Sequence, residues 1–205
     1  MSKPTVAAII LAAGRSTRMG ANKLLADVGG APMVRVVAQA VLASAARPVL
    51  VVTGHQADEV RAALAGLEVK CVANPDFAQG LATSLKAGLR AVPSDADGVL
   101  VVLGDMPRVT SEHLDRLSAA FAASGGSAVV VPTHEGRRGN PVLWPRALYA
   151  QMLTLDGDAG ARRLLATHAD RVREVDLATD AIFLDVDTPE ALADLRANRH
   201  PGRRA

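Results

Sequence analysis

The sequence predicts an α/β protein of three layers, with a mostly parallel β-sheet between two layers of helices. Short apolar runs rich in β-branched residues alternate with helical patterns along the chain, as expected of repeated strand–helix units. The first runs are apolar throughout, which is typical of parallel strands that are covered on both faces. Between residues 126 and 187 the strand-like runs lie closer together. This spacing predicts a small mixed or antiparallel insertion.

The individual elements follow from these runs and from the turn residues between them. Strands are expected at residues 6–11, 49–53, 69–73, 98–103, 128–132, 142–144, 172–176 and 182–186. Helices are expected at residues 33–45, 57–65, 83–91, 111–123, 146–152, 159–168 and 189–197. Ser111, followed by Leu114 and Leu117, is typical of an N-cap ahead of an apolar stripe.

Length and charge limit the classes of protein that the chain can belong to. Its 205 residues suffice for one substantial core, and we expect a single domain over residues 1–195. Residues 196–205 hold four arginines and no acid, and we expect a disordered basic tail there. The remainder carries 19 of the 23 basic residues against 21 acidic ones, and only 2% of the chain is aromatic. A surface for nucleic acid is therefore not supported.

Cysteine usage and hydropathy point to a protein of the reducing interior of the cell. Cys71 is the single cysteine, so no internal disulfide can form, and its apolar neighbours favour a small core residue. The N-terminal letters MSKPT lack a basic region followed by a signal-length apolar segment. No stretch reaches the roughly 18 apolar residues that a membrane span needs. We expect a cytoplasmic protein without a membrane partner.

The loop after the first strand gathers positive charge without any acid. Residues 11–23 read LAAGRSTRMGANK, and ligands of open α/β sheets bind beyond the carboxyl ends of the strands. Gly14 allows the backbone to approach an anion closely, while Arg15, Arg18 and Lys23 surround it with cations. The side-chain hydroxyls of Ser16 and Thr17 add neutral donors. We interpret the loop as a binding site for a polyphosphate.

Other known phosphate-binding and catalytic patterns do not fit. Residues 12–17 read AAGRST and lack the dinucleotide fingerprint, and the Walker pattern fails because two residues separate Gly20 from Lys23. The five histidines show no pair at metal-ligand spacing, which argues against zinc. No serine lies in a G-x-S-x-G elbow. Covalent catalysis has no support in the sequence.

Acidic residues near the ends of two later runs are candidate metal ligands. Asp105 follows the apolar run 99–103, and its expected place is the same edge of the sheet as the cationic loop. Asp185 and Asp187 follow a second run, and strand alternation would place both on one side. Carboxylates with phosphate oxygens suit Mg²⁺. Turn or capping acids remain an alternative for the later pair.

In these stretches the chain resembles the MobA-like nucleotidyltransferases and, within them, the molybdenum cofactor cytidylyltransferases. The matching motifs occur in order and span about residues 4–195. They are residues 11–20 with Lys23, 74–84 (NPDFAQGLATS), 104–107 (GDMP), 138–142 (RGNPV), 157–162 (GDAGAR) and 185–189 (DVDTP). Asn140 departs from the family, which more often has His there.

The resemblance implies a Rossmann-like nucleotidyltransferase fold and transfer of CMP from CTP to molybdopterin. The products are the cytosine dinucleotide cofactor and pyrophosphate, and such enzymes serve molybdenum hydroxylases of the xanthine dehydrogenase type. In this family the sequence Ala-Ala-Gly, here residues 12–14, accompanies CTP, whereas Ala-Gly-Gly or Gly-Gly-Gly accompanies GTP. The resemblance thus carries the expectation of cytosine as the base.

The resemblance also assigns roles to residues. The nucleotide-binding residues are expected to be Leu11, Ala12, Ala13, Gly14, Arg15, Ser16, Lys23, Asn74, Gly80, Ser84 and Asp105. Lys23, Arg18 and Asp105 are the expected catalytic residues, and Asp105 and Asp187 the ligands of Mg²⁺. The acceptor is expected to meet Arg138, Gly139, Asn140, Pro141, Asp158 and Arg162. Turns, caps and plain loops remain alternatives at Asn74, Gly80, Ser84 and the acceptor residues.

Three other functions remain open at this point. The same family contains guanylyltransferases, and a cytidylyltransferase for a sugar phosphate or alcohol phosphate would need a similar nucleotide site. From another class, a nucleotide-sensing or chaperone module would keep the fold without turnover. The presence of both Lys23 and Asp105 counts against a pure binding module, because such a module need not keep phosphate and metal groups together.

Overall fold

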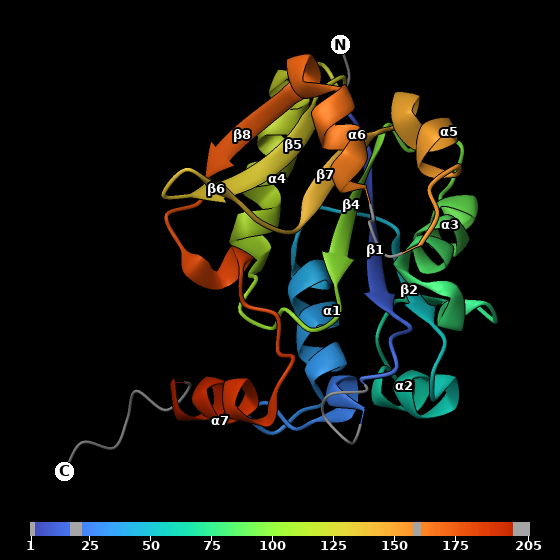
Figure 1. The fold of residues 1–205 in the computed structure, drawn as a ribbon, viewed down its shortest axis with the longest axis vertical. Coiled ribbons are helices and arrows are strands. Elements are labelled where there is room, and N and C mark those ends of the chain that lie inside the picture. Colours follow the sequence, from blue (N-terminus) through green and yellow to red (C-terminus); the bar gives the residue numbers. More distant parts are fainter. Residues whose placement is uncertain (1–2, 17–21, 158–160, 199–205) are drawn as a thin grey trace.

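Four parallel strands form one half of the sheet. The computed structural model describes residues 3–16, 22–157 and 161–198. The strands β1 (Val6–Ala12), β2 (Val49–Thr53), β3 (Lys70–Ala73) and β4 (Gly98–Leu103) lie in the order β3-β2-β1-β4. Figure 1 shows β2, β1 and β4 side by side. All three pairs are parallel. The carboxyl ends of these strands therefore share one edge, as the sequence predicts.

The other half of the sheet is mixed. Beyond β4, the strand β7 (Val142–Pro145) runs antiparallel to both β4 and β5 (Val129–His134). The short β6 (Arg137–Arg138) is also antiparallel to β5, whereas β8 (Val172–Asp176) is parallel to it. Thr133 pairs with residues of both β6 and β8, so these two strands lie on opposite sides of β5. The predicted mixed insertion is confirmed.

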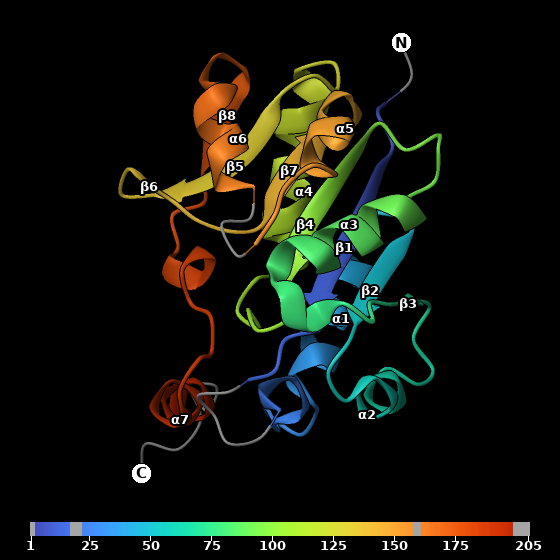
Figure 2. The ribbon, with the colours of Figure 1, turned by 45° about the vertical axis from the view of Figure 1, so that its right-hand side comes forward.

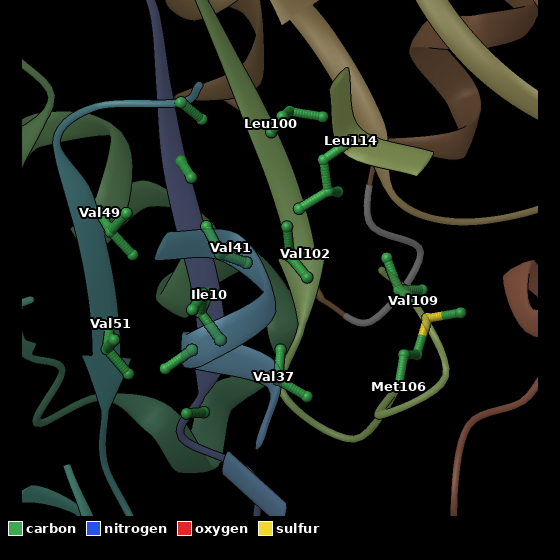
Figure 3. Packing of buried hydrophobic residues seen from close by; sticks show 14 of the residues in the cluster. Ile10, Val37, Val41, Val49, Val51, Leu100, Val102, Met106, Val109 and Leu114 are labelled. Carbon is green, nitrogen blue, oxygen red and sulfur yellow. The ribbon is translucent and has the colours of Figure 1, made fainter. Parts of the chain in front are cut away.

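Helices cover both faces of the sheet. The side chains of β1 alternate between the two apolar cores that lie on these faces. Its even-numbered residues pack with α1 (Met33–Ala43), α2 (Ala57–Ala63) and α4 (Ser111–Ala123). Its odd-numbered residues pack with α3 (Leu81–Ala91), α5 (Tyr149–Met152) and α6 (Arg162–Thr167). Figure 2 shows α3 in front of the sheet and α1 behind it. In Figure 3 Ile10 lies on the same face as Val51 and Val102, toward α1. The three-layer prediction is confirmed.

Several predicted boundaries differ from the structure. The strand expected at 182–186 is wrong, because the chain forms the 3-10 turn η5 (Asp180–Ile182) and then runs irregularly. The helix expected at 146–152 is divided into η3 (Arg146–Leu148) and α5, and the described part of the helix expected at 159–168 begins at Arg162. Thr110, not Ser111, is the N-cap of α4. The sequence pattern also did not predict β6 or the 3-10 turns η1 (Lys23–Leu25), η2 (Phe77–Gln79) and η4 (Ala169–Arg171).

The last helix, α7 (Pro189–Asn198), packs away from the sheet. Leu192 and Leu195 form a separate small core with Val28, Met33 and Val186. Figure 1 shows α7 at the bottom of the molecule, near the start of α1. The helix includes the first three residues of the expected tail, and residues 199–205 lie outside the described part. No described helix has the length and apolar character needed to cross a membrane.

Candidate active site

The ends of β1 and β4 meet at one edge of the sheet. Leu11 and Leu103 are partners in the parallel register, and the Gly104 N–H continues it by donating to the Leu11 carbonyl oxygen at 3.0 Å. A Cβ atom at Gly104 would lie 2.9 Å from that oxygen. The strand end therefore brings Asp105 directly beside the loop that follows β1.

A cavity of about 710 Å³ opens at this edge. Ten of the residues that the sequence assigned to the site line it, namely Leu11, Ala13, Gly14, Arg15, Ser16, Lys23, Gly80, Ser84, Asp105 and Asp187. The remaining lining residues were missed and are Leu24, Phe77, Ala78, Gln79, Leu81 and Leu103. Residues 77–81 lie within the NPDFAQGLATS motif, so the motif itself was the signal that could have found them.

An ion cluster forms one wall of the cavity. Lys23 Nζ lies 2.6 Å from Asp105 Oδ2 and also contacts Asp187 Oδ1. The side chains of Lys23 and Asp105 are 13% and 16% exposed. Lys23 is held in place because its backbone N–H donates to Ser16 Oγ at 3.1 Å and because the preceding residue, Asn22, caps η1. The cluster thus joins the β1 loop, the end of β4 and the C-terminal segment.

Burial and charge oppose each other in this cluster. Burial raises the pKa of the Asp105 carboxyl above its ordinary value of 3.8, although the Lys23 ammonium counteracts the shift. For Lys23, burial alone would lower the pKa, but the charges and hydrogen bonds of Asp105 and Asp187 outweigh it and raise the pKa above 10.5. Lys23 is therefore a cation at neutral pH.

The acidic residues of the cluster fit a divalent cation. Asp105, Asp185 and Asp187 each offer a carboxylate oxygen, and these oxygens lie within 4.8 Å of one another. Asp105 Oδ1 is buried and accepts no hydrogen bond from any other described residue. Buried carboxylate oxygens without a partner are suited to a hard cation such as Mg²⁺ or Mn²⁺. Asp185, which the sequence left as an alternative to Asp187, belongs to the same group.

The segment that brings Asp185 and Asp187 to the cluster is not a strand. The Val186 N–H, between them, donates to the Asp105 carbonyl oxygen at 3.1 Å. Val186 itself is buried in the small core under α7. The C-terminal segment is thus fastened to the end of β4 by its backbone and by an apolar side chain.

The cavity lining also contains an aromatic ring, that of Phe77. The Phe77 ring lies 5.7 Å from the Arg15 guanidinium carbon and 6.1 Å from the His55 ring. A Cβ atom at Gly54 would lie 2.7 Å from Phe77 Cβ and 2.9 Å from Ala13 Cβ. Gly54 therefore allows Phe77 to pack tightly beside the loop, where the ring can contact a flat ligand.

Asn74 and Ala12 lie behind the walls of the cavity and do not line it. The buried Asn74 amide donates to Thr83 Oγ1 at 2.9 Å and to Ser84 Oγ at 3.0 Å, and its oxygen accepts from the Asp76 N–H. These bonds tie the end of β3 to the start of α3. Ala12 is buried in the core on the α1 side of the sheet.

The four expected acceptor residues from Arg138 to Pro141 also lie outside the cavity lining. Arg138 forms an ion pair with Glu174 at 2.7 Å, and the Asn140 N–H donates to the Ile182 carbonyl oxygen at 2.9 Å. Pro141 is buried and starts the return to β7. Arg18, Asp158 and the side chain of Arg162 lie outside the described part of the structure.

Comparison with known proteins places the chain among nucleotidyltransferases. The MobA-like NTP transferase domain matches residues 8–172. The molybdenum cofactor cytidylyltransferase of Escherichia coli K12 is 29% identical over 185 residues, covering 89% of this chain and 91% of that protein. The purine catabolism protein PucB of Bacillus subtilis 168 is 30% identical over 207 residues, covering 93% and 95%.

The bifunctional proteins GlmU match only in part. The GlmU of Kineococcus radiotolerans is 44% identical over 131 residues, which is 62% of this chain and 26% of that protein. The GlmU of Agrobacterium fabrum is matched over 36% of its length. The chain therefore spans about a quarter to a third of these relatives.

Solved structures agree in fold. The Rv0371c homologue of Mycobacterium sp. strain JC1 has a TM-score of 0.82 at 29% identity, covering 94% of this chain and 96% of that one. A manganese complex of Rv0371c from Mycobacterium tuberculosis H37Rv has a TM-score of 0.79 at 25% identity, covering 96% and 100%. A divalent metal thus accompanies this fold in a similar protein.

Proposed function

Because the chain belongs to the MobA-like NTP transferase family, we propose that it transfers CMP from CTP to the phosphate of molybdopterin. The products are molybdopterin cytosine dinucleotide and pyrophosphate. The observation that carries the proposal is the convergence of Lys23, Asp105 and Asp187 on a cavity at the carboxyl edge of the sheet, with Asp185 beside the other two aspartates. The nearly full-length similarity to a molybdenum cofactor cytidylyltransferase supports the choice of substrates.

The triphosphate of CTP binds on the side of the β1 loop. Gly14 offers its backbone to the cavity, and Arg15, Ser16 and Lys23 also line it. Donors of this kind are suited to phosphate oxygens. Arg18, which the family resemblance adds, would approach the same phosphates. Lys23, a cation at neutral pH, neutralises charge that develops on the leaving pyrophosphate.

Asp105 and Asp187, with Asp185 beside them, hold Mg²⁺ in this proposal. Their oxygens are close enough to share one cation, and Asp105 Oδ1 has no other partner among the described residues. A cation held there would supply Lewis-acid neutralisation of the charge on the α-phosphate and its neighbours. The manganese complex of a similar protein supports divalent metal use.

The chemical step needs no strong general base. The second pKa of a phosphate monoester is about 6, so the acceptor is mostly ionised near pH 7. An oxygen of that phosphate attacks the α-phosphorus of CTP in line, the bond from the α-phosphorus to the bridging oxygen breaks, and pyrophosphate leaves. The protein accelerates this step by holding the two substrates in line and by neutralising charge.

The base is proposed to lie against Ala13 and Phe77. Both residues line the cavity, and Phe77 contributes an aromatic ring to the lining. The Ala-Ala-Gly sequence at residues 12–14, which accompanies CTP in the family, supports cytosine. An aromatic wall alone accepts any base, because every base has a flat face.

The acceptor is proposed to enter between the loop at Arg138–Pro141 and the segment before α6. The Gly157 carbonyl oxygen accepts from the Ala82 N–H at 3.1 Å, next to Leu81 in the cavity wall. The chain that leads to Asp158 and Arg162 therefore starts at the rim of the cavity. Asn140, in place of the usual His, would face this substrate.

A matrix of substrates tests the proposal. CTP, GTP, ATP and UTP are each combined with molybdopterin and with sugar phosphates and alcohol phosphates, and pyrophosphate release is measured. We expect release with CTP and molybdopterin. Preference for GTP would indicate the guanylyltransferase, and preference for another acceptor a different cytidylyltransferase. Absence of release with every pair would favour a nucleotide-sensing or chaperone module.

A further inference from the structure

The segment that carries Asp185 and Asp187 has no sheet or helix of its own. It begins after Ile182, at the end of η5, and it runs irregularly until α7 begins at Pro189. A metal site needs ligands that are held at fixed distances from one another. Contacts outside the segment must therefore set the distance of these two carboxylates from Asp105.

The first of these contacts is the joint between β6 and β7. The Asn140 N–H donates to the Ile182 carbonyl oxygen at 2.9 Å, while the Gly139 N–H donates to Pro132 in β5 at 2.9 Å. Two successive amides thus connect the sheet to the segment. Ile182 is fully buried at this joint.

Gly139 is required here for space. A Cβ atom at this position would lie 2.5 Å from the Ile182 carbonyl oxygen and 2.7 Å from Ile182 Cγ1. Both distances are shorter than real Cβ contacts, and one of them involves backbone, which cannot turn aside as a flexible side chain can. Any side chain at Gly139 would therefore push Ile182 away from the sheet.

The second contact lies at the other end of the segment. The Val186 N–H donates to the Asp105 carbonyl oxygen, and the Val186 side chain is buried with Val28, Met33 and α7. Asp185 and Asp187 flank this residue. A shift at Ile182 would be carried along the short stretch to Val186 and would change where both carboxylates lie.

We propose that Gly139 and the backbone amide of Asn140 are positioning residues, which hold Ile182 and thereby set the spacing of Asp185 and Asp187 relative to Asp105. The proposal rests on the metal site of the proposed function. It gives Gly139 and the Asn140 amide a task separate from the contact with the acceptor that the family resemblance assigns to this loop. The side chain of Asn140 is not needed for that task.

Binding of Mn²⁺ alone to the full chain tests the proposal. Calorimetry or electron paramagnetic resonance is used to compare the wild type with Gly139→Ala and Asn140→Ala. We expect Gly139→Ala to weaken Mn²⁺ binding by about 10–100-fold, the range typical of residues that orient metal ligands. Asn140→Ala should bind Mn²⁺ as the wild type does, because the bond to Ile182 is made by the backbone.

Pyrophosphate release provides a second readout. In Gly139→Ala the Mn²⁺ concentration for half-maximal rate should rise, whereas in Asn140→Ala, which keeps the backbone bond to Ile182, it should equal that of the wild type. Contact of this loop with the acceptor is measured separately, as a change in the KM for the acceptor at saturating metal. Unchanged Mn²⁺ affinity in folded Gly139→Ala would overturn the proposal, and so would an equal loss of affinity in Asn140→Ala.

A second variant covers the case in which Gly139→Ala does not fold. Ile182→Ala removes the side chain that is buried at the joint and leaves Gly139 intact, and Val60→Ala in α2 is the matched control because it is also fully buried. We expect both to lower Tm but only Ile182→Ala to weaken Mn²⁺ binding. Equal Mn²⁺ affinity in both would contradict the proposal. A wild type that bound no Mn²⁺ would instead refute the metal site of the proposed function.

Discussion

Lys23 Nζ lies between Asp105 Oδ2, at 2.6 Å, and Asp187 Oδ1, although Lys23 and Asp187 are 164 residues apart in the sequence. The ammonium thus contacts two carboxylates of the three-aspartate group that fits a divalent cation. A divalent cation held by these carboxylates would lie close to the ammonium and repel it. We therefore expect metal binding to release Lys23 toward the phosphates of the nucleotide.

Lys23→Met should separate the two roles of this residue. Without nucleotide we expect Mn²⁺ affinity to rise, because a competing cation is removed. CTP affinity should fall by about tenfold or more, since a hydrogen bond to a charged group contributes about 1.5–3 kcal/mol. Calorimetric titration with each ligand measures both effects.

Lys86→Met is the matched control for Lys23→Met. Lys86 also forms an ion pair, with Asp156 at 2.9 Å, but it does not line the cavity. Neither affinity should change in this control. A loss of Mn²⁺ affinity in Lys23→Met would show that the ammonium does not compete with the metal.

Asp105→Asn should abolish transfer without unfolding the protein, and Asp105→Ala should do the same. Loss of a metal ligand removes several kcal/mol of charge stabilisation, and we expect pyrophosphate release to fall by at least about 100-fold. Burial opposes the charge of Asp105, and this effect raises its pKa, whereas the Lys23 ammonium favours the charge. Removal of the charge therefore has two opposing effects, and the Tm of Asp105→Asn at pH 7 should lie close to that of the wild type. Normal turnover with Mg²⁺ would refute the role of Asp105.

Gly14→Ala should reduce nucleotide binding at unchanged stability. No atom of the described residues lies within 4 Å of a Cβ atom at Gly14, and its φ is outside the left-handed region. The part of the chain that the structure describes thus does not require glycine there, whereas a phosphate close to the backbone does. We expect a Tm within about 1 °C of the wild type, since exposed substitutions change stability little, and a clearly higher KM for CTP. An unchanged KM would argue against backbone contact with the phosphates.

His113→Gln should alter how stability depends on pH. His113 Nδ1 accepts from the Thr110 N–H at 3.2 Å in the capping box of α4, which requires a neutral ring. Burial lowers the pKa of His113 below 6.5, and Arg116 adds to the shift while Glu112 opposes it. Between the pKa of His113 in the folded state and 6.5, the folded state therefore binds fewer protons than the unfolded state. The contribution of His113 to the free energy of unfolding is thus present above pH 6.5 and is lost as the pH falls through the folded pKa.

Urea unfolding at pH 7.5 and pH 5 measures the effect. Gln accepts the same capping hydrogen bond without titrating, so the wild type should lose stability relative to His113→Gln at the lower pH. If the difference in free energy of unfolding between the wild type and His113→Gln were the same at both pH values, the lowered pKa of His113 would be contradicted.

Much of the fold could be predicted because it depends on local patterns. The continuous apolar runs of β1 and β4 indicate buried parallel strands, and parallel strands share a carboxyl edge. That reasoning is enough to place Asp105 beside the cationic loop. The prediction of a strand at residues 182–186 is wrong because Ile182 and Val186 are buried by different neighbours, the first at Gly139 and the second under α7. An apolar pattern shows that a residue is buried, but it does not show what buries it.

The sequence by itself determined the three-layer α/β class, the cationic loop and the acids that could accompany it. Charge and periodicity are properties of neighbouring residues, so they can be read along the chain. Only the tertiary structure decided that Asp185 joins Asp105 and Asp187, that Phe77 lines the cavity and that Asn74 does not. These relationships join elements far apart in the chain, and packing and backbone hydrogen bonds between those elements set their distances.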